Sequence, residues 1–241
     1  MQFPSILVKA RLLKRYKRFF VDAELNNGKI ITAHCPNTGS MKGLTSPGSI
    51  IWVSKSDNPK RKLRYTWELI EDKHTKTLVG VNTQSPNKIV YEALNNKLIS
   101  KLTSYTEIKK EVKYGKNSRI DFLLNDLNNN KCYLEVKNVH FSPKKGLAQF
   151  PDSVTTRGTK HLKELSNLVK SGTRAVMIYL VQRKDCSKFS IAYDIDPSYA
   201  NYFDIAKKSG VEMLSYACDI NTESISISKL LEIKNIKGNK K

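Results

Sequence analysis

The repeating pattern of the sequence changes near residues 80–85, and this change limits the chain to a two-part fold. Before it, short runs alternate apolar and polar residues, as β-strands do, and turn signals such as Asn26-Asn27-Gly28 and Pro47-Gly48 separate them. The predicted strands are residues 7–13, 19–25, 29–33, 49–54 and 63–71. Five short strands without a helix are typical of a small closed barrel of the OB type. We therefore expect residues 1–83 to form an OB-like barrel.

Helices and strands alternate in the second part, residues 84–241. Ser85 and Pro86 suit the start of a helix, and apolar residues at helical spacing extend it over 86–101. Further strands are predicted over 109–114, 119–124, 131–139, 175–181 and 211–219, with helices over 156–170 and from Asp196-Pro197 to Gly210. This order predicts a mixed sheet flanked by helices, with a basic tail at 237–241. The fold class is thus a two-domain α+β/α/β protein.

Charge favours a polyanionic partner. The formal net charge is +20 and the pI is about 9.7. Residues 1–83 hold fifteen basic and six acidic residues, and five of the nine arginines. The chain is also rich in Lys and Asn, so compositional drift is an alternative source of the surplus.

Two features predict a cytoplasmic protein without a membrane partner. No apolar run approaches the roughly 20 residues that a membrane span needs, and Lys9, Arg11 and Lys14 interrupt any signal sequence. The four cysteines are far apart in sequence, which favours reduced thiols. His34-Cys35 is not a convincing zinc pair, because neighbours on a strand point in opposite directions.

The most informative residues are Asp121 and the run Glu135-Val136-Lys137, on two strands joined by the polar loop 125–130. Alternation puts Glu135 and Lys137 on one face, and an antiparallel hairpin brings Asp121 beside them. Two carboxylates would hold Mg²⁺ or Mn²⁺, which lowers the pKa of a bound water, and the lysine would orient that water. The pattern predicts a metal-dependent phosphodiesterase, with Asp121 and Glu135 as metal ligands and Lys137 as a catalytic residue. The alternative is an ordinary strand with solvent-facing charges.

Other residues are candidates for supporting roles. Glu92, on the first helix of the second part, is a candidate third metal ligand, or a solvent-facing helix residue. His161 faces inward at the start of helix 156–170, toward the phosphate or as a core histidine. Arg157 and Lys160 at the same helix start are candidates for phosphate binding, and Gln182 is a candidate catalytic residue at the end of strand 175–181.

Basic and aromatic residues interleave in the barrel segment, as in proteins that bind nucleic-acid strands. The first cluster surrounds Phe19 and Phe20, and the second precedes Tyr65. The predicted nucleic-acid-binding residues are Arg11, Lys14, Arg15, Tyr16, Lys17, Arg18, Lys60, Arg61, Lys62 and Arg64, with Arg157 and Lys160 from the second part. The alternative is a solvated set of charges around a packed core. The stretch Asn37-Thr38-Gly39-Ser40 is suited either to phosphate contact or to shaping a loop.

Several longer motifs resemble the sugar fermentation stimulation protein A family over nearly the whole chain. They are Lys14-Arg15-Tyr16-Lys17-Arg18-Phe19, Ala33-His34-Cys35-Pro36-Asn37-Thr38-Gly39-Ser40-Met41, Asn58-Pro59-Lys60-Arg61-Lys62-Leu63, Tyr65-Thr66-Trp67-Glu68-Leu69, Ser118-Arg119-Ile120-Asp121-Phe122-Leu123-Leu124, Glu135-Val136-Lys137-Asn138-Val139 and Arg157-Gly158-Thr159-Lys160-His161-Leu162. The resemblance implies an N-terminal OB-like barrel and a C-terminal PD-(D/E)xK nuclease-like domain. It also implies DNA binding without strong sequence preference and a role in the regulation of sugar (maltose) utilisation.

The sequence departs from the wider nuclease pattern at one position. Ile120 stands where the proline of the Pro-Asp pair is expected, while a literal Pro151-Asp152 follows the Glu135-Val136-Lys137 strand and is predicted to be a loop or helix entry. Two hypotheses follow: a Mg²⁺-dependent nuclease, or a DNA-binding regulator on a scaffold that does not cut. A site for a small phosphorylated ligand ranks below both, because no P-loop is present. The choice between DNA, the favoured partner, and RNA stays open, as does the oligomeric state.

Overall fold

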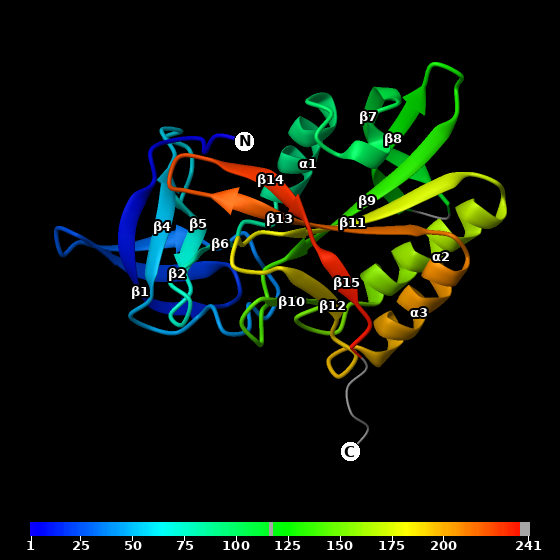
Figure 1. The fold of residues 1–241 in the computed structure, drawn as a ribbon. Coiled ribbons are helices and arrows are strands. Elements are labelled where there is room, and N and C mark those ends of the chain that lie inside the picture. Colours follow the sequence, from blue (N-terminus) through cyan, green and yellow to red (C-terminus); the bar gives the residue numbers. More distant parts are fainter. Residues whose placement is uncertain (116–117, 237–241) are drawn as a thin grey trace.

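The computed structural model describes residues 1–115 and 118–236, which form a barrel followed by an α/β domain (Figure 1). In the barrel, the strands are β1 (Val8–Tyr16), β2 (Phe20–Leu25), β3 (Ile30–His34), β4 (Ile50–Lys55), β5 (Tyr65–Glu71) and β6 (Leu78–Gly80). Their order is β3-β2-β1-β4-β5-β6, and a parallel pairing of β3 with β5 closes the first five strands into a barrel. The predicted OB-like barrel is confirmed.

Alternation of side chains explains why these strands close around a core. On β1, Ala10 and Leu12 point inward, while Arg11 between them is exposed. The barrel core is filled by residues such as Trp67 and Met41, neither of which is exposed to solvent. Gly28, with φ of +79°, lies in the tight turn from β2 to β3, where glycine meets no steric penalty.

The second part is built on a six-stranded mixed sheet in the order β14-β13-β11-β9-β8-β7, in which β9, β11 and β13 are parallel. Its elements are α1 (Ser85–Asn95), a 3₁₀ turn (Ser100–Leu102), β7 (Tyr105–Tyr114), β8 (Ser118–Asp126), β9 (Lys131–Val139), β10 (Leu147–Phe150), α2 (Thr156–Lys170), β11 (Arg174–Val181), β12 (Lys188–Ile191), α3 (Pro197–Lys208), β13 (Glu212–Ile220), β14 (Ile225–Leu230) and β15 (Glu232–Lys234). Helix α1 packs on one face of the sheet, and α2 and α3 pack on the other (Figure 1). The predicted mixed-sheet αβ domain is confirmed.

The differences from the predicted elements are local. The helix predicted over 86–101 ends at Asn95, because Lys97 adopts φ of +55° and turns the chain. The short strands β6, β10, β12, β14 and β15 were not predicted, and β10, β12 and β15 form a separate parallel sheet. The predicted tail, 237–241, lies outside the described residues. No helix within the described ranges is long and apolar enough to cross a membrane.

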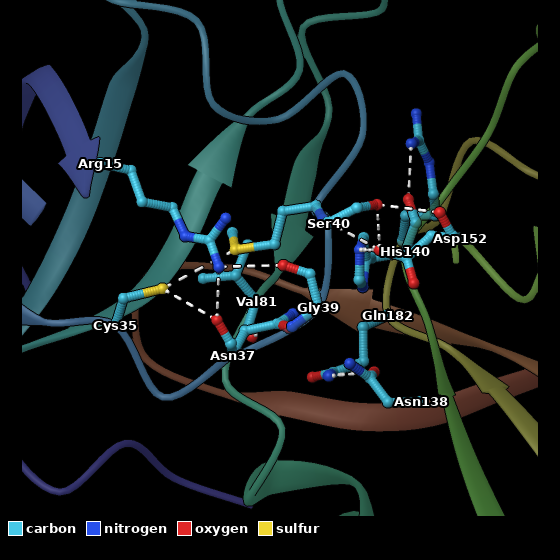
Figure 2. A network of polar contacts seen from close by, with 12 residues as sticks. Arg15, Cys35, Asn37, Gly39, Ser40, Val81, Asn138, His140, Asp152 and Gln182 are labelled. Atoms are coloured by element: carbon cyan, nitrogen blue, oxygen red, sulfur yellow. Dashed lines mark hydrogen bonds and ion pairs between the residues drawn. The ribbon is translucent and has the colours of Figure 1, made fainter. Parts of the chain in front are cut away.

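A buried polar network joins the barrel to the α/β domain (Figure 2). The Gly80 N–H at the end of β6 donates to the Gln182 carbonyl (2.8 Å), and the Gln182 side chain donates to Asn138 Oδ1 (2.6 Å). A Cβ on Gly80 would lie 2.4 Å from Gln182 Oε1, so this close approach requires glycine. Beside it, Arg183, 2% exposed, donates to Asp72 of the barrel (3.0 Å). These contacts fix how the barrel sits on the sheet.

Candidate metal centre and nucleic-acid interface

Asp121 lies where strands β8 and β9 separate. Their pairing runs from Asn125 and Lys131 to Phe122 and Leu134, and there it stops. Beyond this point the Val136 N–H donates to the side-chain oxygen Asp121 Oδ2 (2.7 Å). Ile120 packs beneath α2 and α3 while Phe122 packs beneath α1, so the alternation of faces is broken at Asp121. The irregular strand thus directs this carboxylate into the opening between β8 and β9.

Glu135 and Lys137 share a face of β9, and His161 of α2 meets them there. Glu135 is 3% exposed, and its Oε1 contacts both Lys137 Nζ (2.7 Å) and His161 Nδ1. Lys137 Nζ lies 3.0 Å from the same His161 nitrogen, so the imidazole tautomer decides which of the two bonds forms. The second oxygen, Glu135 Oε2, is buried and has no hydrogen-bond partner in the described part of the chain.

The two carboxylates differ in electrostatic state. Burial and the neighbouring Glu135 raise the pKa of Asp121 to about 6. Burial also opposes ionisation of Glu135, but Lys137 and His161 outweigh it and lower the pKa of Glu135. A buried ionised carboxylate with one free oxygen, beside a second carboxylate destabilised by repulsion, is suited to a cation. The residues therefore fit the divalent metal that the motif implies.

The protein itself supplies few ligands for such a metal. Within residues 1–115 and 118–236, no three His, Cys, Asp or Glu side chains are grouped so as to hold a metal ion. Asp121 Oδ1 also accepts a hydrogen bond from Asn87 Nδ2 of α1 (2.8 Å). The remaining ligand positions would therefore be left to water and substrate oxygens, which is the usual situation for Mg²⁺.

Other predicted site residues are distributed differently. Glu92, the candidate third ligand, pairs with the Met1 ammonium (2.7 Å), and Asn87, five residues earlier on α1, is the residue that reaches Asp121. Gln182 belongs to the domain junction, where it bonds Asn138. The sequence signal missed for Asn87 was its place in the first turn of α1, on the side facing β8.

The start of α2 adds positive groups next to the carboxylates. Arg157 is exposed, and its Nε lies 3.4 Å from His161 Nε2. Lys160 Nζ lies 3.7 Å from Glu164 Oε1. Thr155 caps this helix by accepting the Gly158 N–H (3.1 Å). The contact with His161 places Arg157 at the edge of the candidate centre.

In the first basic cluster of the barrel, the side chains have unequal freedom. Arg15, which is predicted to bind nucleic acid, donates from its guanidinium to the carbonyls of Asn37 (2.8 Å) and Gly39 (2.9 Å) and so holds a loop. Tyr16 is half-buried, donates to Asp22 (3.2 Å) and stacks on Phe20. The aromatic that reaches solvent is Phe19, which is 48% exposed.

The remaining predicted cations lie on the barrel surface. Arg11 pairs with Glu24, and Lys14 lies 3.5 Å from Asp22. The exposed cations predicted to bind nucleic acid are Arg11, Lys14, Lys17, Arg18, Lys60, Arg61, Lys62 and Arg64. The stretch Asn37-Thr38-Gly39-Ser40 shapes a loop: Ser40 donates to Asp152 across the domain junction (Figure 2).

Comparison with known proteins identifies the family. Residues 13–81 match the family described as "SfsA N-terminal OB domain", and residues 84–224 match "Sugar fermentation stimulation protein RE domain". The chain belongs to the sugar fermentation stimulation protein family. It is 49% identical to the sugar fermentation stimulation protein homolog of Maricaulis maris, over 97% of this chain and 99% of that one. The homolog of Brucella anthropi is 52% identical, over 97% of this chain and all of that one.

A solved structure of the family has the same fold. The structure of Pyrococcus furiosus SfsA in complex with Ca²⁺ superposes with a TM-score of 0.86 and 25% sequence identity, covering 97% of this chain and 98% of that one. The resemblance drawn from the motifs is thus confirmed at the level of family and fold.

Proposed function

We propose that this member of the sugar fermentation stimulation protein family binds nucleic acid, DNA above all, and hydrolyses its phosphodiester bonds with a divalent cation. The observation that carries the proposal is the pair of carboxylates at the split between β8 and β9. Asp121 is held there with its pKa raised to about 6, and Glu135 keeps a buried oxygen that has no partner among the residues that the structure describes. Burying two carboxylates costs free energy, and a cation bound between them would offset that cost.

Asp121 and Glu135 would hold the cation, and Mg²⁺ or Mn²⁺ suits their oxygen ligands. The Ca²⁺ bound by the Pyrococcus furiosus relative belongs to the same class of oxygen-preferring ions. When bound, the cation would neutralise phosphate charge and lower the pKa of water. No third side-chain ligand is needed in this proposal, and Glu92 is not part of it.

The chain's own residues would do the positioning. Lys137 Nζ, held 2.7 Å from Glu135, would orient the attacking water and offset the charge that develops on the phosphate. His161 lies against both side chains and keeps the ammonium in place. Asn87 fixes the Asp121 carboxylate through Oδ1, and Arg157 would bind a phosphate oxygen at the edge of the centre.

The barrel would hold the strand by phosphate contacts. Its exposed cations and the net charge of +20 predict binding that falls steeply as salt rises, since each phosphate contact releases counterions. Because such contacts carry no base information, we propose binding with little sequence preference. A domain boundary near residue 83 separates this surface from the cutting centre.

The test is cleavage of end-labelled single- and double-stranded DNA and RNA with Mg²⁺, Mn²⁺ or EDTA. Asp121→Ala/Glu135→Ala should abolish metal-dependent cutting while keeping binding in EDTA. Glu92→Gln is the matched control, because it also removes a carboxylate but one that pairs with Met1. Cutting that the double variant retains would refute the assigned centre. Binding without cutting under any metal would leave the alternative, a DNA-binding regulator of sugar metabolism.

A further inference from the structure

A polar cleft of about 360 Å³ lies between the barrel and the start of α1. It is lined by strands β3, β4 and β5, by the N-terminal residues, by the linker after β6 and by the first turn of α1. The lining residues on which the argument depends are His34, Ser54, Arg61, Glu68, Asn82 and Lys88. None of them belongs to the candidate metal centre, and the volume falls in the range of small-ligand sites.

The cleft contains a buried, preorganised acceptor. Glu68 is 4% exposed, and its two oxygens accept hydrogen bonds from Ser54 Oγ (2.7 Å) and Asn82 Nδ2 (2.8 Å). Both donors are neutral, and no ion pair within the described residues includes Glu68. Each carboxylate oxygen can accept a further bond. A neutral acceptor would be enough to anchor Asn82 of the linker. A carboxylate at this position is therefore suited to a further hydrogen-bond donor from a ligand.

The rim of the cleft is positive. Arg61 is exposed and uses one Nη2 bond to Thr66 Oγ1 (3.0 Å), which leaves further N–H groups for a ligand. Lys88, in the first turn of α1, is also exposed and lines the same cleft. Burial and the nearby Arg61 lower the pKa of His34, so its ring is neutral near pH 7 and offers one donor and one acceptor.

Acceptor and cations together select a ligand that has both an anionic group and an N–H or O–H donor. We propose that the cleft binds one unpaired nucleotide, its phosphate on Arg61 and Lys88 and its base edge on Glu68. Base pairing occupies the ring N–H of thymine (N3) and of guanine (N1), which does not face either groove of a duplex, so only an unpaired base can offer this donor to Glu68. The inference deepens the proposed function and rests on its nucleic-acid-binding half.

The place of the cleft agrees with a strand that runs toward the candidate centre. Lys88 lines the cleft, and its neighbour Asn87 donates to Asp121 (2.8 Å). The first turn of α1 therefore separates the two sites. A nucleotide held in the cleft would position the adjoining phosphates toward the carboxylates.

The test measures binding in EDTA, so that no cleavage enters. Fluorescence anisotropy follows a labelled oligothymidylate, an abasic strand of equal length with the same phosphates, and a duplex. The variants are Arg61→Ala, Lys88→Ala and Glu68→Gln, each checked for folding by thermal melting. Lys29→Ala is the matched control, because it removes one exposed cation at the end of β3 farthest from His34.

Arg61→Ala and Lys88→Ala should each weaken oligothymidylate binding by about tenfold, as the loss of a charge-assisted bond does, while Lys29→Ala has a smaller effect. Glu68→Gln is the sharpest variant, because the two explanations predict opposite signs. If binding is purely electrostatic, removing the negative charge of Glu68 tightens the binding of a polyanion. If Glu68 accepts a hydrogen bond from the base, its replacement weakens the binding. We expect weaker binding and a smaller preference for oligothymidylate over the abasic strand.

The outcomes separate the inference from the proposed function. If the wild type binds no nucleic acid, both fail. Suppose that the wild type binds, that Lys88→Ala and Lys29→Ala have the same affinity for oligothymidylate, and that Glu68→Gln binds more tightly than the wild type. The cleft proposal is then overturned and the proposed function stands. A protein that binds as expected here yet never cuts would keep the cleft and lose the nuclease.

Discussion

Replacing Asp121 by asparagine should raise the free energy of unfolding of the metal-free protein while it removes the proposed activity. The ionised Asp121 is destabilised by burial and by Glu135, and its pKa is raised from the ordinary 3.8 to about 6. Asparagine has nearly the same shape without the charge. Its oxygen can accept the Val136 N–H, and rotation of the Asn87 amide restores the second bond.

The pKa of Asp121 sets the size and the pH dependence of this gain. A difference of about two pKa units corresponds to roughly 3 kcal/mol, which is a ceiling because the site relaxes. Since the folded-state pKa of Asp121 is the higher one, the favourable contribution of its protonated form is complete below about pH 3.8 and is lost as pH rises through about 6. The variant's advantage should therefore be full above about pH 7 and vanish near pH 4, with a gain in Tm of roughly 2–4 °C per kcal/mol.

The assay is calorimetric melting in EDTA across this pH range, repeated with Mg²⁺. Divalent cation should raise the Tm of the wild type and leave Asp121→Asn unchanged, because only the wild type keeps both carboxylates. Asp126→Asn, on the same strand, is the control: hydrogen bonds from Asn130 and the loop backbone lower the pKa of Asp126, so its replacement should not stabilise. An Asp121→Asn protein less stable than wild type, with a difference that ignores pH, would refute the reasoning.

Three further changes test the centre and the junction. Lys137→Met should lower the rate of cleavage by roughly 10²–10³-fold with binding in EDTA retained, since one stabilising donor is lost; single-turnover assays measure it, and an unchanged rate would remove Lys137 from the mechanism. Arg183→Met should cost roughly 1–3 kcal/mol in urea unfolding, because it removes the cation that pairs with the partly exposed Asp72 and Asp185; a neutral result would mean that these pairs are not needed. Gly80→Ala should cost roughly 1–3 kcal/mol through its clash with Gln182, and Gln182→Ala should recover part of this loss in a double-mutant cycle, whereas strict additivity would contradict the clash.

The predictions from sequence succeeded where the local pattern carried the information. Alternation and turn residues were enough for the barrel, and the bounds of β9, Lys131–Val139, agree with the predicted strand. The short strands were not predicted, because a strand such as β12, Lys188–Ile191, has too few residues to show an alternation of apolar and polar residues. Its pairing with β10 and β15 depends on segments far away in the chain.

Residue roles that depend on distant partners were also not predictable. The sequence around Arg15 predicts a surface cation, yet its guanidinium donates to the carbonyls of Asn37 and Gly39, more than twenty residues away. Glu92 has the helical position of a metal ligand, but the chain terminus returns to meet it. The spacing of residues in the sequence predicts which face of a helix or strand a side chain occupies. The residues that this side chain contacts depend on the fold. Asp121, Glu135 and Lys137 were grouped from sequence because a short hairpin joins their strands, so their partners are nearly local.

Two aspartates, Asp152 and Asp121, have pKa values shifted in opposite directions. Asp152 belongs to the literal Pro-Asp pair; burial opposes its ionisation, but the His140 ring and hydrogen bonds from Ser40 and Met41 lower its pKa to about 2. Because the folded-state pKa is the lower one, its contribution of roughly 2–3 kcal/mol is present above about pH 4 and lost as pH falls through about 2. Asp152 therefore stabilises the junction of barrel and sheet (Figure 2). Asp121, beside Ile120 where the motif would have proline, has the opposite shift, and a cation would relieve it. The literal Pro-Asp pair thus lies at the junction, whereas the raised pKa of Asp121 supports its proposed role as a metal ligand.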